Sequence, residues 1–168
     1  MQGMRIDTFN AAPRDEAIAA IRPCLDIARW IDAVVQARPY SSIDALLEQA
    51  RRAAEPFTAT EIDGALAHHP RIGERASGSG AEARFSAAEQ AGLGAGSEQI
   101  ERALRQGNID YEQRFNRVFL IRAAGRDLAE ILAELRRRMD NDAQHELLEV
   151  AAQLREIACG RLRAIFTS

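Results

Sequence analysis

Two short motifs contain the residue types in this sequence that could carry out chemistry. The pentapeptide His69–Gly73 begins with an imidazole, and Ser86 and Glu89 follow it after a Gly/Ser-rich stretch. An imidazole titrates near neutral pH, so it can accept and donate a proton, and a carboxylate can orient it. These side chains, set at helix ends on both sides of one loop, would be suited to proton transfer on a small molecule.

The helical pattern before His69 predicts which way its side chain points. The segment Thr58–Glu61 has the spacing of a capping box, which would open a helix. At about 100° per residue, His69 falls within roughly 20° of the apolar Ile62, whereas His68 lies about 120° away. Pro70 disfavours helix at the residue before it. We therefore expect His69 at a helix end, on the inward face, beside a loop.

Each candidate residue also has a structural interpretation. A histidine on an apolar helical face is commonly a satisfied core residue. Ser86 and Glu89 have the spacing of a capping box, with residues 73–84 as a loop and Ser86 as the N-cap of the next helix. A capping serine can still present its hydroxyl to a ligand. Spacing alone therefore leaves the structural and the catalytic interpretations open.

The last predicted helix, over residues 142–166, contains an arginine on its apolar face. Counting from Leu154, Arg161 falls about 20° from the centre of the apolar stripe, whereas Arg163 falls on the opposite side. A guanidinium stays charged on burial, so an inward arginine requires an anionic or carbonyl-rich partner. Either a protein carboxylate or a substrate carboxylate could be that partner of Arg161.

The elements that must position these residues are predicted to be helices. Ala, Leu, Arg and Glu are abundant, and aromatic residues make up only 5% of the 168 residues. Gly107 is expected to end a helix, and 118–121 could be a short buried strand or an irregular apolar segment. The sequence predicts an all-α, single-domain multi-helix bundle over residues 1–168. Helices are expected from about residue 13, around 27–34, from about 43, and over 58–69, 86–92, 97–107, 111–115, 126–139 and 142–166.

Composition argues against several classes of function. A net charge of −3 does not favour a general nucleic-acid binder. No segment has the pattern of a signal peptide or the length of a membrane span, so a cytoplasmic enzyme or binding protein is expected. Cys24 and Cys159 fit small buried hydrophobes better than a disulfide framework. His68, His69 and His145 could bind a metal, but adjacent histidines on a helix rarely share an ion.

The order of motifs along the chain resembles that of a known family. The matching residues extend over nearly the whole chain, and two of the motifs, His69–Gly73 and Ser86–Gly92, are together quite specific. They are Phe9-Asn10, Trp30, His69–Gly73, Ser86–Gly92, Asn108, Tyr111, Phe115, Phe119, Arg138, Asn141, Glu146 and Arg161-Leu162. On these residues the chain resembles the 2-oxo-4-hydroxy-4-carboxy-5-ureidoimidazoline (OHCU) decarboxylases, the ureide-pathway enzymes that form (S)-allantoin. One departure is Asn116, where the family usually has Gly.

The resemblance implies a cofactor-free, all-α decarboxylase that acts on a small ureide and forms a homodimer. It implies that His69 is the catalytic acid/base and Glu89 its carboxylate companion, with no metal. The substrate site would be lined by Pro70, Ser86 and Arg161 and by backbone groups of Phe119, Leu120 and Ile121. It also allows functional coupling to the upstream hydroxyisourate hydrolase.

Two other classes compete with this interpretation. A helical protein could keep the fold and bind a ureide or another small anion without turnover. A helical metalloprotein is the more remote alternative.

Overall fold

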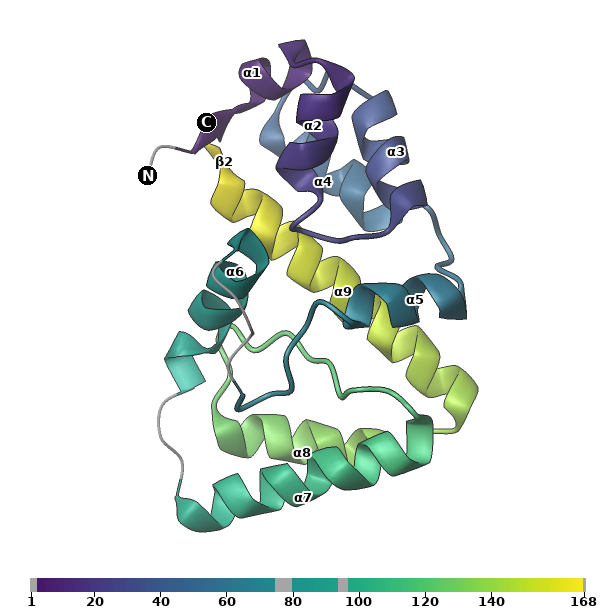
Figure 1. Ribbon diagram of the computed structural model, residues 1–168, viewed down its shortest axis with the longest axis vertical. Helices are drawn as coiled ribbons and strands as arrows, with labels where there is room; N and C mark the ends of the chain where they lie inside the picture. The colour runs from purple at the N-terminus through teal and green to yellow at the C-terminus, as the bar shows by residue number, and fades with distance from the viewer. Residues whose placement is uncertain (1–2, 75–79, 94–96, 168) are drawn as a thin grey trace. The chain divides into compact units, whose positions relative to one another are not determined.

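The computed structural model describes residues 3–74, 80–93 and 97–167, which are mostly helical (Figure 1). The predicted all-α class is confirmed. The strands of this part of the chain, β1 (Met4–Arg5) and β2 (Phe166–Thr167), form one short parallel pair. Contacts divide the chain into two compact units. Unit 1 comprises residues 1–65 with 154–168, and unit 2 comprises residues 66–153.

Unit 1 contains short helices whose starts and apolar faces largely follow the sequence pattern. Trp30 is fully buried, and its indole N–H donates a 2.9 Å hydrogen bond to the carbonyl of Ala50. Ser42 caps α4, and Thr58 and Glu61 form the predicted capping box at the start of α5. The helices are α1 (Ile6–Ala11), α2 (Arg14–Ile21), α3 (Ala28–Gln36), α4 (Ile43–Arg52), α5 (Ala59–Leu66) and, from Leu154, the end of α9 (Ala143–Ile165).

The sequence pattern did not predict α1, since a helix was expected only from about residue 13. This six-residue helix has no side-chain cap, so its own propensity would not sustain it. Instead Phe9 is fully buried and packs edge-on against Phe166, with ring centroids 5.1 Å apart. The side chain of Asn10 exchanges two 2.8 Å hydrogen bonds with the backbone of Tyr40. Tertiary contacts therefore stabilise α1.

Unit 2 is built around two long helices that pack side by side (Figure 1). Gly107 was expected to end a helix, but α7 continues through it. A Cβ atom at Gly107 would lie 3.0 Å from a methyl group of Leu135, so the glycine admits close packing between α7 and α8. The elements of unit 2 are α6 (Ala81–Gln90), the 3₁₀ turn η1 (Ala91–Leu93), α7 (Glu98–Phe115), α8 (Leu128–Arg138) and the start of α9.

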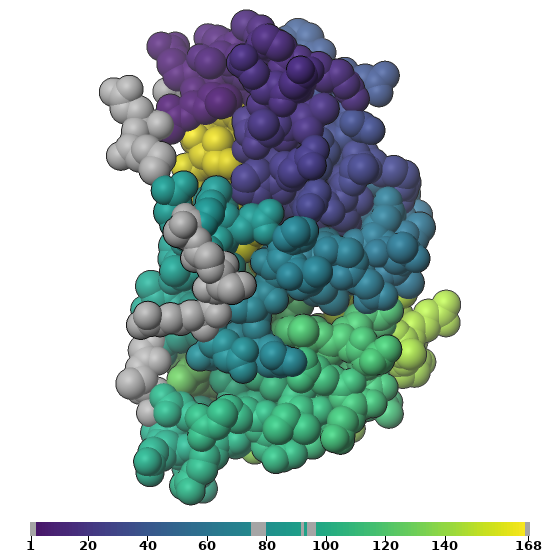
Figure 2. Space-filling view, in the orientation of Figure 1, coloured from purple at the N-terminus to yellow at the C-terminus, as the bar shows by residue number. Residues whose placement is uncertain are grey.

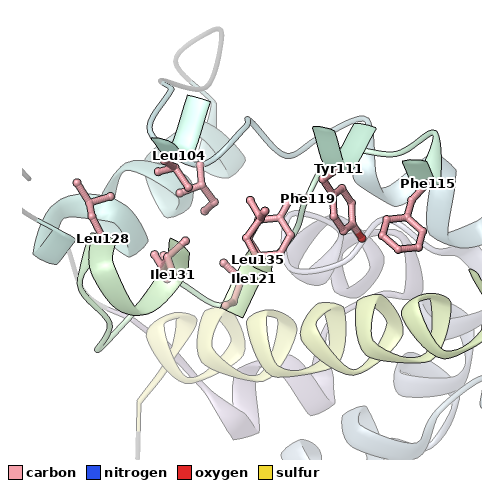
Figure 3. Packing of buried hydrophobic residues seen from close by; sticks show 10 residues of the cluster. Leu104, Tyr111, Phe115, Phe119, Ile121, Leu128, Ile131 and Leu135 are labelled. Carbon is pink, nitrogen blue, oxygen red and sulfur yellow. The ribbon is translucent and has the colours of Figure 1, made fainter. Parts of the chain in front are cut away.

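The apolar core of unit 2 lies along the facing sides of α7 and α8 (Figure 3). Asn116 ends α7 in the left-handed conformation, with φ of 56° and ψ of 35°. Asn tolerates this conformation better than most non-glycine residues, so Asn116 is compatible with a position at which the resemblance leads us to expect Gly. The chain then runs through 118–123 without regular secondary structure, so this segment is irregular and not a strand. The core residues labelled in Figure 3 are Leu104, Tyr111, Phe115, Phe119, Ile121, Leu128, Ile131 and Leu135.

A buried ion pair joins α8 to α9 within this core. Arg138 and Glu146 are each 1% exposed, and Arg138 Nη2 lies 2.5 Å from Glu146 Oε2. The hydroxyl of Tyr111 donates to the same carboxylate, and Asn141 Nδ2 donates to its other oxygen at 3.1 Å. Arg138 Nη1 also donates to the carbonyl of Leu120 at 2.8 Å. Burial, and then the hydrogen bond to Glu146, raise the pKa of Tyr111 and keep it protonated.

Removing one member of this pair should strongly destabilise the protein. Arg138→Met or Glu146→Leu leaves an uncompensated buried charge, so each should lower the free energy of unfolding by about 3–5 kcal/mol. The double variant Arg138→Met/Glu146→Leu should lose less than the sum of the two. Urea unfolding followed by circular dichroism measures all three. A loss below about 1 kcal/mol in both single variants would contradict the assigned role.

The ion pair between Arg29 and Glu61 predicts a pH dependence of stability. Both carboxylate oxygens of Glu61 accept 2.8 Å hydrogen bonds from Arg29, which lowers the pKa of Glu61 to about 2. A carboxylate with a depressed folded-state pKa stabilises the fold above its unfolded pKa of about 4.3, and this contribution is lost as pH falls through the folded value. The difference in unfolding free energy between the wild type and Glu61→Gln should therefore be constant above about pH 5 and shrink toward pH 2. Urea unfolding between pH 3 and 7 measures it, and a constant difference throughout would refute the prediction.

Candidate active site

His69 lies in the turn that follows α5 and not on the helix itself. The helix ends at Leu66, and the backbone N–H of His69 donates to the carbonyl of Leu66 at 3.0 Å. The expected helical position of His69 is therefore wrong by one turn, because the chain leaves the helix before Pro70. His69 and Pro70 are half-buried, whereas His68 is exposed and lies 3.3 Å from a carboxylate oxygen of Glu82. His69 is therefore the more buried of the two histidines, as the sequence predicted.

Ser86 and Glu89 lie inside α6 and not at its start. The helix begins at Ala81 with Gly80 at the N-cap position, so the capping-box interpretation of Ser86 and Glu89 is wrong. The loop predicted over 73–84 also extended too far, because residues 81–84 (Ala-Glu-Ala-Arg) are good helix formers that follow Gly80. Positions three apart share a helix face, and here Ser86 is 3% exposed and Glu89 is half-buried. Both polar groups therefore lie on one face of α6, away from the start of the helix.

The loop that follows His69 is bound to α7 by two side chains. Arg71 Nε donates to Glu112 Oε1 at 2.9 Å, and this hydrogen bond raises the pKa of the Arg71 guanidinium. The side chain of the buried Asn108 donates to the carbonyl of Ile72 at 3.3 Å. Asn108 and Glu112 are four residues apart, so both project from one face of α7.

A third side chain binds the same loop from α6. The backbone N–H of Gly73 donates to Gln90 Oε1 at 3.1 Å, and Gln90 Nε2 donates to the carbonyl of Glu74 at 3.4 Å. Gln90 directly follows Glu89 in the chain. Gln90 had no predicted role, although its place in the Ser86–Gly92 motif was a signal for one.

The segment Phe119–Ile121 lies in the core of unit 2, with all three residues at most 4% exposed. The ring of Phe119 packs edge-on against Tyr111, with centroids 5.2 Å apart. Arg138 binds the carbonyl of Leu120, and the N–H of Arg122 donates to the side chain of Gln153 at 2.7 Å. Because the side chains are used for packing, this segment can offer a ligand its backbone only.

Arg161 belongs to unit 1, on the part of α9 that follows Leu154. Arg161 is 2% exposed, whereas Arg163 is exposed. The helical phase therefore predicted correctly which of the two arginines is buried. Arg161 Nη1 donates to the carbonyl of Pro23 at 2.9 Å. This contact supplies one of the carbonyl partners that a buried guanidinium requires.

A cavity of about 610 Å³ is lined in part by residues 71–74 of this loop. Its size is in the range of small-molecule sites. Its lining contains neither His69, Ser86 nor Glu89. The lining residues are Arg71, Ile72, Gly73, Glu74, Gln90, Leu93, Glu101, Leu104, Arg105, Asn108, Ile109, Glu112 and Leu128.

Within 3–74, 80–93 and 97–167, no group of three or more His, Cys, Asp or Glu side chains could hold a metal ion. In the same part of the chain, no helix is long and apolar enough to cross a membrane.

The chain is similar over nearly its whole length to curated proteins. It is 26% identical, over its whole length and 99% of the relative, to 2-oxo-4-hydroxy-4-carboxy-5-ureidoimidazoline decarboxylase of Haloferax volcanii. It is 25% identical over 97% of its length to the uric acid degradation bifunctional protein of Bacillus sp. (strain TB-90). The chain spans about a third of that longer protein, 32% of its length.

Solved structures share the fold. A crystal structure of OHCU decarboxylase in the presence of (S)-allantoin aligns with a TM-score of 0.68 at 22% identity, covering 94% of this chain and 100% of that one. A crystal structure of (S)-allantoin synthase aligns with a TM-score of 0.72 at 13% identity, covering 97% of this chain and 54% of that one. The family model described as OHCU decarboxylase matches residues 10–163. The chain therefore belongs to the OHCU decarboxylase family, a family of decarboxylases.

Proposed function

We propose that this chain catalyses the cofactor-independent decarboxylation of OHCU to (S)-allantoin in urate breakdown. The family match over residues 10–163 and the relative from Haloferax volcanii support this reaction class. The observation that carries the assignment of residues is the place of Ser86 and Glu89 inside α6. Because neither residue lies at the start of the helix, a capping box does not explain the motif, and this supports a role in the site.

The substrate can supply its own electron sink. OHCU has a carboxylate and a hydroxyl on one carbon, next to an imine carbon that bears the ureido group. When the bond to the carboxylate breaks, its electron pair moves into the adjacent carbon–nitrogen double bond, and carbon dioxide leaves. The ring nitrogen takes up a proton from solvent, the hydroxyl gives up its proton to form the carbonyl, and the neighbouring carbon gains a proton from one face. The protein therefore needs to bind the anion, move protons and select the face.

In this proposal His69 moves the proton between the substrate hydroxyl and the reacting carbon. A half-buried imidazole suits this role because it exchanges protons near neutral pH while keeping access to a ligand. Glu89 orients the imidazole or accepts hydrogen bonds from the ureido N–H groups. A positioned general acid/base typically contributes 10²–10⁴-fold in rate, about 3–5 kcal/mol of barrier.

The remaining proposed groups bind the substrate. Ser86 and Pro70 line the site beside Glu89 and His69, and backbone groups of Phe119–Ile121 complete it. Arg161 binds an anionic or carbonyl oxygen, a role that we assign from the sequence resemblance and its charge. Homodimer formation and coupling to hydroxyisourate hydrolase stay predictions of the same resemblance, and a cytoplasmic location stays a prediction from the sequence pattern.

The competing function is binding of a ureide or other small anion without turnover. The two functions differ in their effect on freshly generated OHCU, which decays without enzyme. A decarboxylase shortens its lifetime and forms the (S) product, whereas a binding protein leaves the decay unchanged or slows it.

Loss of the acid/base pair should abolish turnover without unfolding the protein. His69→Ala and Glu89→Ala should each lower kcat by roughly 10²–10⁴-fold, because each removes a proton-transfer or orienting group. His68→Ala is the matched control, since His68 is exposed and pairs with Glu82, and its activity should stay close to that of the wild type. Circular dichroism on fresh OHCU follows the (S)-allantoin formed. Near wild-type rates in both folded variants would sink the assignment.

The role of Arg161 can be separated from a structural role by a conservative change. Arg161→Lys keeps a positive charge but loses the planar donor fork, so KM should rise on the order of tenfold. Arg163→Lys is the control on the same helix, because Arg163 is exposed, and its KM should not change. Steady-state kinetics and thermal unfolding are measured on both variants. A lower melting temperature with an unchanged KM for Arg161→Lys would assign the residue to the fold alone.

A further inference from the structure

We infer that Gln153 is a positioning residue for the backbone groups of Phe119–Ile121. The inference rests on the proposed function, which assigns these backbone groups to substrate binding. Gln153 lies on α9, outside the residues proposed to contact the substrate, and its side chain accepts a hydrogen bond from the N–H of Arg122 at 2.7 Å. Its role is to fix the peptide group that follows Ile121.

The segment that Gln153 binds has no regular secondary structure of its own. Residues 118–123 form neither a helix nor a strand, so no regular series of backbone hydrogen bonds fixes their peptide planes. Packing anchors the side chains instead. Phe119 is 1% exposed, and the central carbon of the Arg138 guanidinium lies 4.6 Å from its ring centroid. Hydrophobic contacts are not directional, so side-chain hydrogen bonds must set the orientation of the peptide groups.

Two such hydrogen bonds flank Ile121. Arg138 Nη1 donates to the carbonyl of Leu120 at 2.8 Å, and Gln153 Oε1 accepts from the N–H of Arg122. A trans peptide group is planar and its C=O and N–H point in opposite directions, so each contact orients a whole peptide group. The N–H of Ile121 therefore points away from Arg138, and the C=O of Ile121 points away from Gln153.

These two groups of Ile121 are a donor and an acceptor that the segment can offer a ligand. Ile121 is 3% exposed, and within residues 3–74, 80–93 and 97–167 no hydrogen bond uses its N–H or its C=O. A buried backbone group without a partner costs free energy, so a ligand that pairs with it gains affinity. A ureide has both N–H donors and carbonyl acceptors. Gln153 therefore sets the direction of the carbonyl that would accept from a substrate N–H.

Gln153 can be changed without removing a charge from the core, whereas Arg138 cannot. The other donors of Arg138 bind the buried Glu146, so the loss of Arg138 would destabilise the fold. Gln153 is half-buried and uncharged. A change at Gln153 should therefore alter the affinity for the substrate and leave folding nearly intact.

Steady-state kinetics on fresh OHCU test this role. Gln153→Met keeps the length of the side chain but removes the acceptor, so KM should rise on the order of tenfold, with kcat within about twofold. Gln153→Glu keeps an acceptor for the N–H of Arg122, so its KM should stay within about twofold of the wild-type value. The control is Gln144→Met, which should change neither constant. Gln144 is exposed in the first turn of α9, which Figure 2 shows at the surface in yellow-green.

Hydrogen exchange adds a readout that does not depend on activity. The amide proton of Arg122 should exchange faster in Gln153→Met than in the wild type, and at a near wild-type rate in Gln153→Glu. The melting temperature of Gln153→Met should change by no more than about 2 °C. An unchanged KM or an unchanged exchange rate in Gln153→Met, a large fall in its melting temperature, or no rescue by Gln153→Glu would overturn the positioning role.

His69→Ala, assayed in parallel, separates the two proposals. If His69→Ala is inactive and Gln153→Met has the KM of the wild type, the inference about Gln153 fails while the proposed function stands. If His69→Ala turns over OHCU at the wild-type rate, the proposed function fails and the inference fails with it. An inactive His69→Ala, a raised KM in Gln153→Met and its rescue in Gln153→Glu together support both.

Discussion

The buried ion pair between Arg138 and Glu146 is the constraint on which unit 2 depends. Two charges removed from water are tolerated only when their remaining hydrogen-bonding groups are satisfied. Tyr111 and Asn141 donate hydrogen bonds to the carboxylate of Glu146. The carbonyl of Leu120 accepts one from the guanidinium of Arg138. These partners come from α7, from the α8–α9 turn and from the irregular segment after α7. Apolar contacts alone are not directional, so the pair and its hydrogen bonds add a directional requirement to the packing of these elements.

The same helix connects this core to the candidate site. The buried stripe of α7 includes Leu104, Asn108 and Tyr111, so one helix face serves both the apolar core and the polar contacts. Tyr111 reaches the ion pair, while Asn108 and the neighbouring Glu112 hold the loop that follows His69. Displacing α7 would therefore move the loop as well as the core. This explains how a loop of the candidate site that includes Gly73 is held by the helices around it.

The sequence predicted those features that depend on regular periodicity within one segment. The last helix, the buried Arg161 and the Thr58–Glu61 capping box follow from local spacing, and all three are present. Other features depend on contacts that spacing does not encode. Gly107 lies inside a helix because a side chain of α8 packs against its backbone, and His69 lies beyond a helix end that its phase had placed further on. The binding of the 71–74 loop by α6 and α7 joins segments distant in sequence, so helical periodicity within one segment does not encode it.

The start of α6 decides between the two interpretations of Ser86 and Glu89. At the start of a helix their spacing would be explained by the backbone N–H groups that have no partner within the helix. In the interior those N–H groups already bond to carbonyls one turn earlier, and serine is a weaker helix former than alanine. Gln90, the next residue, spends its side chain on the loop after His69 and not on its own helix. Ser86, Glu89 and Gln90 therefore lie away from the start of α6, and the side chain of Gln90 binds the loop that follows His69.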